Sequence, residues 1–138
     1  MLFRSKADAA VRDLSAIIKR KPDDAEALNA LGYTLTLHST RYREAHGYIE
    51  KALTLSPDDP AIMDSMGWVD YRLGDSKTAL AFLQKAYAAQ ADPEIAAHLV
   101  EVLLSTGDRN GAHALLQKAL QDNPDDQALK SLATHLTP

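Results

Sequence analysis

The chain of 138 residues contains no cysteine. This absence excludes disulfides, thiol nucleophiles and zinc–thiolate sites, and it is compatible with either the cytosol or the periplasm. No apolar run approaches the ~20 residues that a membrane-spanning helix needs, so we expect no direct membrane insertion of this chain. The net charge of −4 gives no basic field of the kind that attracts nucleic acid, and no nucleic-acid partner is expected.

Recognisable catalytic and cofactor-binding motifs are absent as well. There is no Gly-x-Ser-x-Gly, Gly-x-x-x-x-Gly-Lys or Gly-x-Gly-x-x-Gly sequence. The five histidines lack the His-x-x-x-His and Glu-x-x-His spacings that place two metal ligands on one helical face, so we interpret them as solvated or partly packed. They are His38, His46, His98, His113 and His135. The sequence predicts no enzyme, no cofactor and no metal.

A repeated segment dominates what is present. Residues 21–24, 56–59 and 123–126 each end in Pro-Asp-Asp, and each separates two alanine-rich stretches. The first two segments begin 35 residues apart and the last two begin 67 apart, which fits two repeats with a degenerate copy between them. A fixed period near 34 residues indicates a helical solenoid. Because the acidic pairs recur at expected helix starts, we interpret them as helix caps.

Small residues recur with the same period. They are Ala10, Ala45, Ala79 and Ala112, spaced 35, 34 and 33 residues apart. Apolar residues follow each of them four and seven positions later, which places each trio on one face of a helix. Gly32 and Gly67 share one phase in the preceding helices and predict a close approach between helices. Gly74 and Gly107, each followed by aspartate, predict turns.

This pattern resembles the tetratricopeptide repeat, a 34-residue helix–turn–helix unit. The resemblance implies an all-α, right-handed solenoid of antiparallel helix pairs with about eight helices in a single domain. We expect repeats at 25–59, 60–92 and 93–126. A lone second helix at 5–20 precedes them, so the chain looks like a piece of a longer array, and a capping helix at 126–136 follows. Val100 stands where the pattern has glycine, so slightly wider packing is expected there.

In this family the first helix of each repeat lines a concave groove. The groove residues expected by phase are Asn29, Tyr33, Leu37, Asp64, Trp68, Tyr71, Arg72, Glu101 and Leu104, with Thr36, Ala97, Ser131 and His135 beside them. Trp68, the only tryptophan, is interpreted in two ways: as a central recognition residue, because tryptophan is common among interface hot spots, or as a structural wedge between first helices.

Some tetratricopeptide adaptors bind chaperone C-terminal carboxylates with Lys, Asn and Arg at set groove positions. The matching positions here hold Asn29, Tyr33, Ser65, Glu94 and His98, which lack the basic groups. A chaperone partner of that class is not expected.

A narrower resemblance rests on residues 28–35, 59–74 and 92–99, above all on the run Asp-Ser-Met-Gly-Trp-Val at 64–69. These stretches resemble the C-terminal repeats of proteobacterial outer-membrane lipoproteins, one of which brings cell-wall hydrolases to a periplasmic carboxyl-terminal processing protease. The resemblance implies a periplasmic scaffold, anchored to the outer membrane in the parent protein by a lipidation signal upstream. A cytoplasmic location is the alternative.

Two functions therefore stay open. The first is a non-enzymatic scaffold or adaptor that binds a protein or peptide in its groove, with a periplasmic protease or its substrates as the implied partner. The second is a structural spacer or self-association segment of a longer array. An exposed apolar face on the N-terminal helix, made by Ala10, Leu14 and Ile17, predicts weak homo-oligomerisation. Replacing Trp68 by alanine should separate the two functions.

Overall fold

The structure is a computed structural model that describes the backbone of residues 2–136 and the side chains of residues 6–136. All regular secondary structure in these residues is α-helical, which confirms the predicted fold class. The eight described helices are α1 (Leu2–Arg20), α2 (Ala25–His38), α3 (Tyr42–Leu55), α4 (Pro60–Arg72), α5 (Ser76–Ala89), α6 (Pro93–Ser105), α7 (Arg109–Asp122) and α8 (Gln127–Leu136). Over the described range, no helix combines the length and apolar character that crossing a membrane requires.

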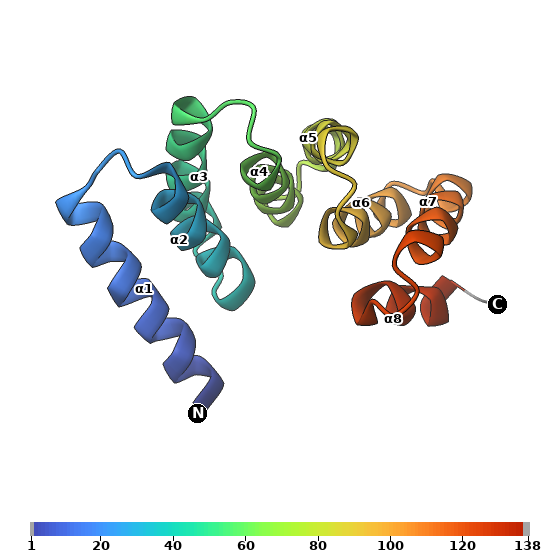
Figure 1. The fold of residues 1–138 in the computed structure, drawn as a ribbon, viewed down its shortest axis with the longest axis horizontal. Helices are drawn as coiled ribbons and strands as arrows, with labels where there is room; N and C mark the ends of the chain where they lie inside the picture. Colours follow the sequence, from blue (N-terminus) through green and yellow to red (C-terminus); the bar gives the residue numbers. More distant parts are fainter. Residues whose placement is uncertain (1, 137–138) are drawn as a thin grey trace.

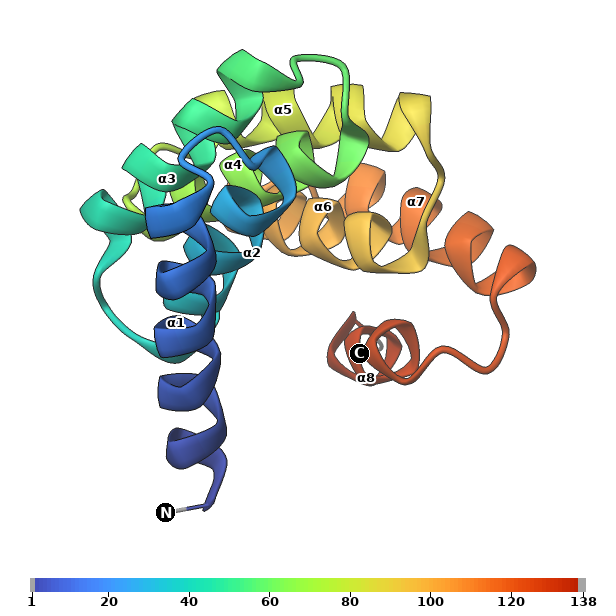
Figure 2. The same cartoon turned by 60° about the vertical axis from the view of Figure 1, so that its left-hand side comes forward.

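The helices form an arc with α1 at one end and α8 at the other (Figures 1 and 2). Helices α2, α4, α6 and α8 lie on the inner side of this arc, and each contacts the next. Helices α3, α5 and α7 lie outside, and within the described range they contact inner helices but not one another. The inner helices therefore form one continuous surface, which we call the inner face.

Aspartates begin α2, α4 and α8, as the sequence predicted, whereas Arg41 precedes α3 and makes no side-chain cap bond. The Ala27 N–H donates to Asp24 Oδ1 at 3.0 Å, and the Ala61 N–H donates to Asp59 Oδ1 at 2.9 Å. Asp126 caps α8 in the same way. Each bond satisfies a backbone donor that the first turn of a helix leaves without a partner.

Glycines end two of the inner helices. Gly74 and Gly107 have φ angles of 92° and 90°, in the left-handed region where a Cβ atom is unfavourable. Asp75 and Asp108 follow directly and cap α5 and α7. The predicted Gly-Asp turns are confirmed.

Glycines also allow two helix pairs to pack closely. A Cβ atom at Gly32 would lie 2.9 Å from the Ala45 carbonyl oxygen, and one at Gly67 would lie 2.6 Å from Leu83 Cγ. Contacts this short are not tolerated, so both positions need glycine. At Val100, where the glycine is missing, the side chain is fully buried and α6 packs less closely on α7 than the earlier helices pack in their pairs. A wider separation of these two helices stays a prediction.

Helix α1 packs only on α2 among the described elements. The side chains that pack are Val11, Leu14 and Ile18. The packed face of α1 therefore differs from the predicted apolar face of Ala10, Leu14 and Ile17. Two of its three residues lie one position later in the chain.

Candidate functional site on the inner helices

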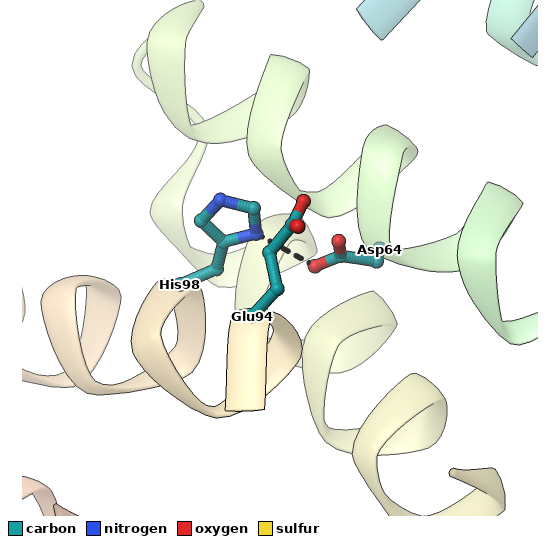
Figure 3. Close-up of side chains that lie close together, drawn as sticks. All are labelled: Asp64, Glu94 and His98. Carbon is teal, nitrogen blue, oxygen red and sulfur yellow. Dashed lines mark hydrogen bonds and ion pairs between the residues drawn. The ribbon is translucent and has the colours of Figure 1, made fainter. Parts of the chain in front are cut away.

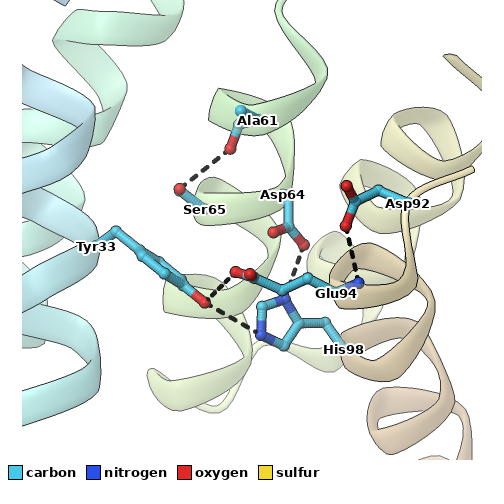
Figure 4. Close-up of polar contacts among 7 residues, drawn as sticks. All are labelled: Tyr33, Ala61, Asp64, Ser65, Asp92, Glu94 and His98. Atoms are coloured by element: carbon cyan, nitrogen blue, oxygen red, sulfur yellow. Dashed lines mark hydrogen bonds and ion pairs between the residues drawn. The ribbon is translucent and has the colours of Figure 1, made fainter. Parts of the chain in front are cut away.

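A polar cluster joins three inner helices at the middle of the inner face. Tyr33 comes from α2, Asp64 from α4, and Glu94 and His98 from α6 (Figure 4). The Tyr33 hydroxyl donates to Glu94 Oε1 at 2.7 Å, and its oxygen lies 3.4 Å from His98 Nε2. The other ring nitrogen, Nδ1, lies 2.8 Å from Asp64 Oδ1. We call these four residues the polar cluster.

The protons of the polar cluster can be placed from its donors and acceptors. A carboxylate oxygen only accepts, so His98 Nδ1 carries a proton and donates it to Asp64. The single Tyr33 hydroxyl proton goes to Glu94, the nearer acceptor. Tyr33 therefore offers only its oxygen to His98 Nε2. Burial, the hydrogen bond to Glu94 and the charges of Glu94 and Asp64 all raise the pKa of Tyr33 well above its usual range, which keeps its hydroxyl protonated.

Trp68 lies beside this cluster, not in an open groove. Its ring stacks on His98 with centroids 4.2 Å apart and an angle of 20° between the planes, and it contacts Tyr71 at 5.1 Å. Trp68 is only 9% exposed, against 3% for the core residue Met66. Of the two interpretations of Trp68, this packing favours the structural wedge between inner helices.

Asp64 also differs from the expected groove residue, since it is 6% exposed and bonded to His98. The burial of Asp64 and of Trp68 has one cause. Asp64 and Trp68 are four residues apart and share a helical face, and that face of α4 lies against α6.

Most of the other predicted groove residues remain at least partly accessible. Leu37, Arg72 and Glu101 are exposed, and Asn29, Tyr33, Tyr71 and Leu104 are partly buried. Arg72 is already engaged: its guanidinium donates to the Tyr42 hydroxyl at 2.9 Å. The Oδ1 of Asn29 is buried and accepts no hydrogen bond from the protein.

A cleft of about 450 Å³ lies between α6 and α8. Its walls include Ala97, Glu101, Leu104, Ser131 and His135, all expected on the groove surface. The cleft continues the inner face toward the C-terminal end of the arc. Predicted groove residues are thus gathered at α6 and α8, whereas at α4 two of them are buried.

His98 was expected to be solvated or partly packed and is instead buried, with Nδ1 bonded to Asp64 and Nε2 3.4 Å from the Tyr33 oxygen. Two sequence signals could have found it. Glu94 and His98 are four residues apart and so share a face of α6. Asp64 and His98 are 34 residues apart, one more than the 33-residue offset between the starts of α4 and α6, which places them at nearly the same level of neighbouring inner helices.

A second His–Asp pair lies between α3 and α4. His46 Nε2 is 3.3 Å from Asp70 Oδ1, with the His46 side chain 31% exposed. Burial raises the pKa of Asp70, and the His46 charge opposes that rise. Within the described residues, no third metal-ligating group joins this pair.

The fold and inner face define a helical-repeat protein of paired helices. Family models described as tetratricopeptide repeat match residues 2–60, 37–94 and 70–136. The chain belongs to the tetratricopeptide repeat family. Proteins of this family are generally non-enzymatic scaffolds that bind protein or peptide partners.

Individual relatives extend this result. The chain is 52% identical over 103 residues to the TPR repeat-containing protein PA4667 of Pseudomonas aeruginosa, a match over 73% of this chain and 18% of that protein. The chain therefore spans less than a fifth of that relative.

Solved structures share the fold. TTC0263, a TPR protein of Thermus thermophilus, superimposes with a TM-score of 0.84 at 24% identity, over 98% of this chain and 75% of that one. YrrB, described as a TPR protein with an unusual peptide-binding site, gives a TM-score of 0.67 at 21% identity, over 87% and 62% of the two chains. At these identities the likeness shows the fold alone.

Proposed function

We propose that this chain is a non-enzymatic interaction module that binds a protein or peptide segment along its inner face. The observation that carries the proposal is the cleft of about 450 Å³ between α6 and α8, which continues a surface built from four inner helices. The cleft combines apolar and polar walls, as Leu104, Leu132 and Glu101 illustrate. Recognition sites commonly combine apolar walls with a few polar groups that fix orientation.

Two features outside the cleft also support a bound segment. Leu37, on α2, is 47% exposed, the largest value among the large apolar side chains of the described residues. The unpaired Oδ1 of Asn29 lies on the same helix. A buried acceptor without a donor costs about 1–3 kcal/mol, and a partner N–H would remove that cost once the partly buried Asn29 side chain turns outward.

For the biological setting, we propose an adaptor in the periplasm, within a parent lipoprotein anchored to the outer membrane. The proposed partner is a carboxyl-terminal processing protease or one of its substrates. The run at residues 64–69 supports this proposal, because it resembles repeats of lipoproteins with that role. The 52% identity to a Pseudomonas protein supports a bacterial source.

A structural spacer is the second candidate, and the packing of Trp68 favours it. The most distinctive aromatic residue of the inner face is already stacked on His98, and Asp64 is already bonded. A segment whose conspicuous side chains contact one another could serve to hold a longer array together. Weak self-association through the uncovered side of α1 belongs to this second proposal.

Two exposed leucines allow a matched test. Leu37 is 47% exposed on α2, and Leu55 is 41% exposed at the end of α3. Purified carboxyl-terminal processing protease would be titrated with the chain and with Leu37→Asp, Glu101→Lys and Leu55→Asp. We expect each inner-face variant to lose about tenfold or more in affinity, and Leu55→Asp to bind like the original chain.

Other outcomes would favour the alternatives. Equal losses in all three variants would place binding away from the inner face. Absence of binding by the unmodified chain would refute the protease partner and leave the spacer as the better account.

A further inference from the structure

We propose that Asp64, Glu94 and His98 form a binding site for a Zn²⁺ ion. Each of the three offers one ligand atom, and these atoms all lie within 4.8 Å of one another (Figure 3). No other group of three such side chains comes this close among the residues that the structure describes. The site goes beyond the proposed peptide-binding function and does not depend on it.

The donor set selects the metal. One imidazole nitrogen and two carboxylate oxygens, with water completing the coordination, is a ligand set that Zn²⁺ accepts. Ca²⁺ and Mg²⁺ prefer oxygen ligands throughout, which the imidazole does not provide. The absence of cysteine leaves histidine and carboxylates as the zinc ligands that this chain can supply.

The distances require only a small rearrangement. Two ligands on a tetrahedral zinc ion lie about 3.3 Å apart, given bonds of about 2.0–2.1 Å. His98 Nδ1 and Asp64 Oδ1 are already 2.8 Å apart and come from two helices in contact. Glu94 is an exposed residue at the start of α6, so its side chain can move the remaining distance.

The hydrogen bonds around the site match those that a zinc site needs. If Nδ1 binds the metal, the imidazole proton resides on Nε2, which faces the Tyr33 oxygen at 3.4 Å. The Tyr33 hydroxyl already donates to Glu94. Metal-ligating histidines and carboxylates are typically held by hydrogen bonds of this kind. Tyr33 is thus a positioning residue for two of the three ligands.

Aromatic packing restricts the histidine ring. Trp68 stacks on the face of His98, so the imidazole cannot turn away without breaking that contact. A ring held in place loses less entropy when it binds a metal. A bound ion would then link α4 to α6 through side chains of both helices and hold this part of the inner face rigid.

Calorimetric titration with Zn²⁺ tests the proposal. The protein should carry no polyhistidine tag and should first be treated with a chelator. We expect one zinc ion per chain and at least tenfold weaker binding by Glu94→Gln. Tyr33→Phe should weaken binding by about 10–100-fold through loss of the hydrogen bonds that position the ligands. Glu26→Gln, a change to an exposed glutamate in the first turn of α2, the place that Glu94 has in α6, is the matched control and should bind zinc normally.

Two results would overturn the proposal. One is a lack of zinc binding by the unmodified chain. The other is unchanged binding by Glu94→Gln, which would place any bound zinc at other histidines. His98→Gln should abolish binding, but His98 is buried and that variant could unfold. The exposed Glu94 therefore carries the decisive test, with circular dichroism of each variant as the check on folding.

Discussion

Two kinds of helix contact meet at α4, and they differ in chemistry. Toward its pair partner α5, the helix presents Gly67, which fits against Leu83 with no room for a side chain. Toward the next inner helix, α6, it presents Asp64 and Trp68, which contact His98. The first contact is apolar and close, and the second is polar and aromatic.

This difference shows which helix contacts follow from the repeated sequence pattern and which do not. The close contact at Gly67 recurs one repeat earlier, where Gly32 meets Ile49 and Ala45. The polar contact does not recur in the same form, because Asn29 and Ser65 stand one repeat before Asp64 and His98. The close contact within a helix pair therefore follows the repeated sequence, whereas the contact between the inner helices α4 and α6 depends on residues that are not repeated.

Removing the aromatic part of the second contact should have the largest effect. Trp68→Ala deletes a nearly buried ring, and such deletions cost about 3–5 kcal/mol of unfolding free energy. Chemical denaturation followed by circular dichroism measures this cost. Trp68 fluorescence of the unmodified chain should also shift to longer wavelength on unfolding. A loss below about 1 kcal/mol would contradict the packing and restore Trp68 as an accessible groove residue.

The apolar contact should be nearly as sensitive. Gly32→Ala would place a Cβ atom 2.9 Å from the Ala45 carbonyl oxygen, and overpacking of this kind typically costs about 1–3 kcal/mol. Gly47→Ala is the control, because nothing lies within 4 Å of the added atom. That variant should gain about 0.5–1 kcal/mol from helix propensity. If both variants gained stability, the close approach of α2 and α3 would be refuted.

The sequence predicted the contacts within helix pairs better than the contacts between inner helices. Helix pairs, caps and turns were predictable, because each depends on residues near one another in the chain or one repeat apart. The aspartate caps and the glycines of positive φ show this most directly. These features are set by local backbone chemistry, which a single sequence displays.

The inner face was predicted less well, because helical phase gives the direction of a side chain but not the neighbour that covers it. Phase placed Asp64 and Trp68 toward the groove, and the packing of α6 against α4 buried both. Leu37 and Glu101 stayed exposed because no inner helix covers them. The polar cluster was missed because His98 was considered by its spacing to other histidines and not to Asp64.

A smaller effect is expected from the hydrogen bonds of the polar contact. Tyr33→Phe removes the bond to Glu94 and keeps the ring, so we expect a loss of about 1 kcal/mol in metal-free buffer. Glu94 is exposed and can exchange this bond for one to water, which limits the loss. Tyr48→Phe is the control, because Tyr48 is a partly buried tyrosine of α3 that packs against the core beside α2. Equal losses in both variants would mean that the bond to Glu94 adds nothing to stability.

The smallest effect should come from Asp70, whose pairing with His46 contrasts with that of Asp64 with His98. Burial raises the pKa of Asp70, opposed by the His46 charge and reinforced by the charges of Asp75 and Glu50. A carboxyl whose pKa is raised on folding stabilises the protein fully below its ordinary pKa of about 3.9, and this contribution is lost as the pH rises through the higher folded value. Urea unfolding between pH 3 and pH 7 tests this contribution. As the pH rises, the unmodified chain should lose more stability than Asp70→Asn does, by about 1 kcal/mol or less. The exposed Asp58, replaced by asparagine, should follow the unmodified chain. A smaller loss in the unmodified chain than in Asp70→Asn would show that the His46 charge outweighs burial at Asp70.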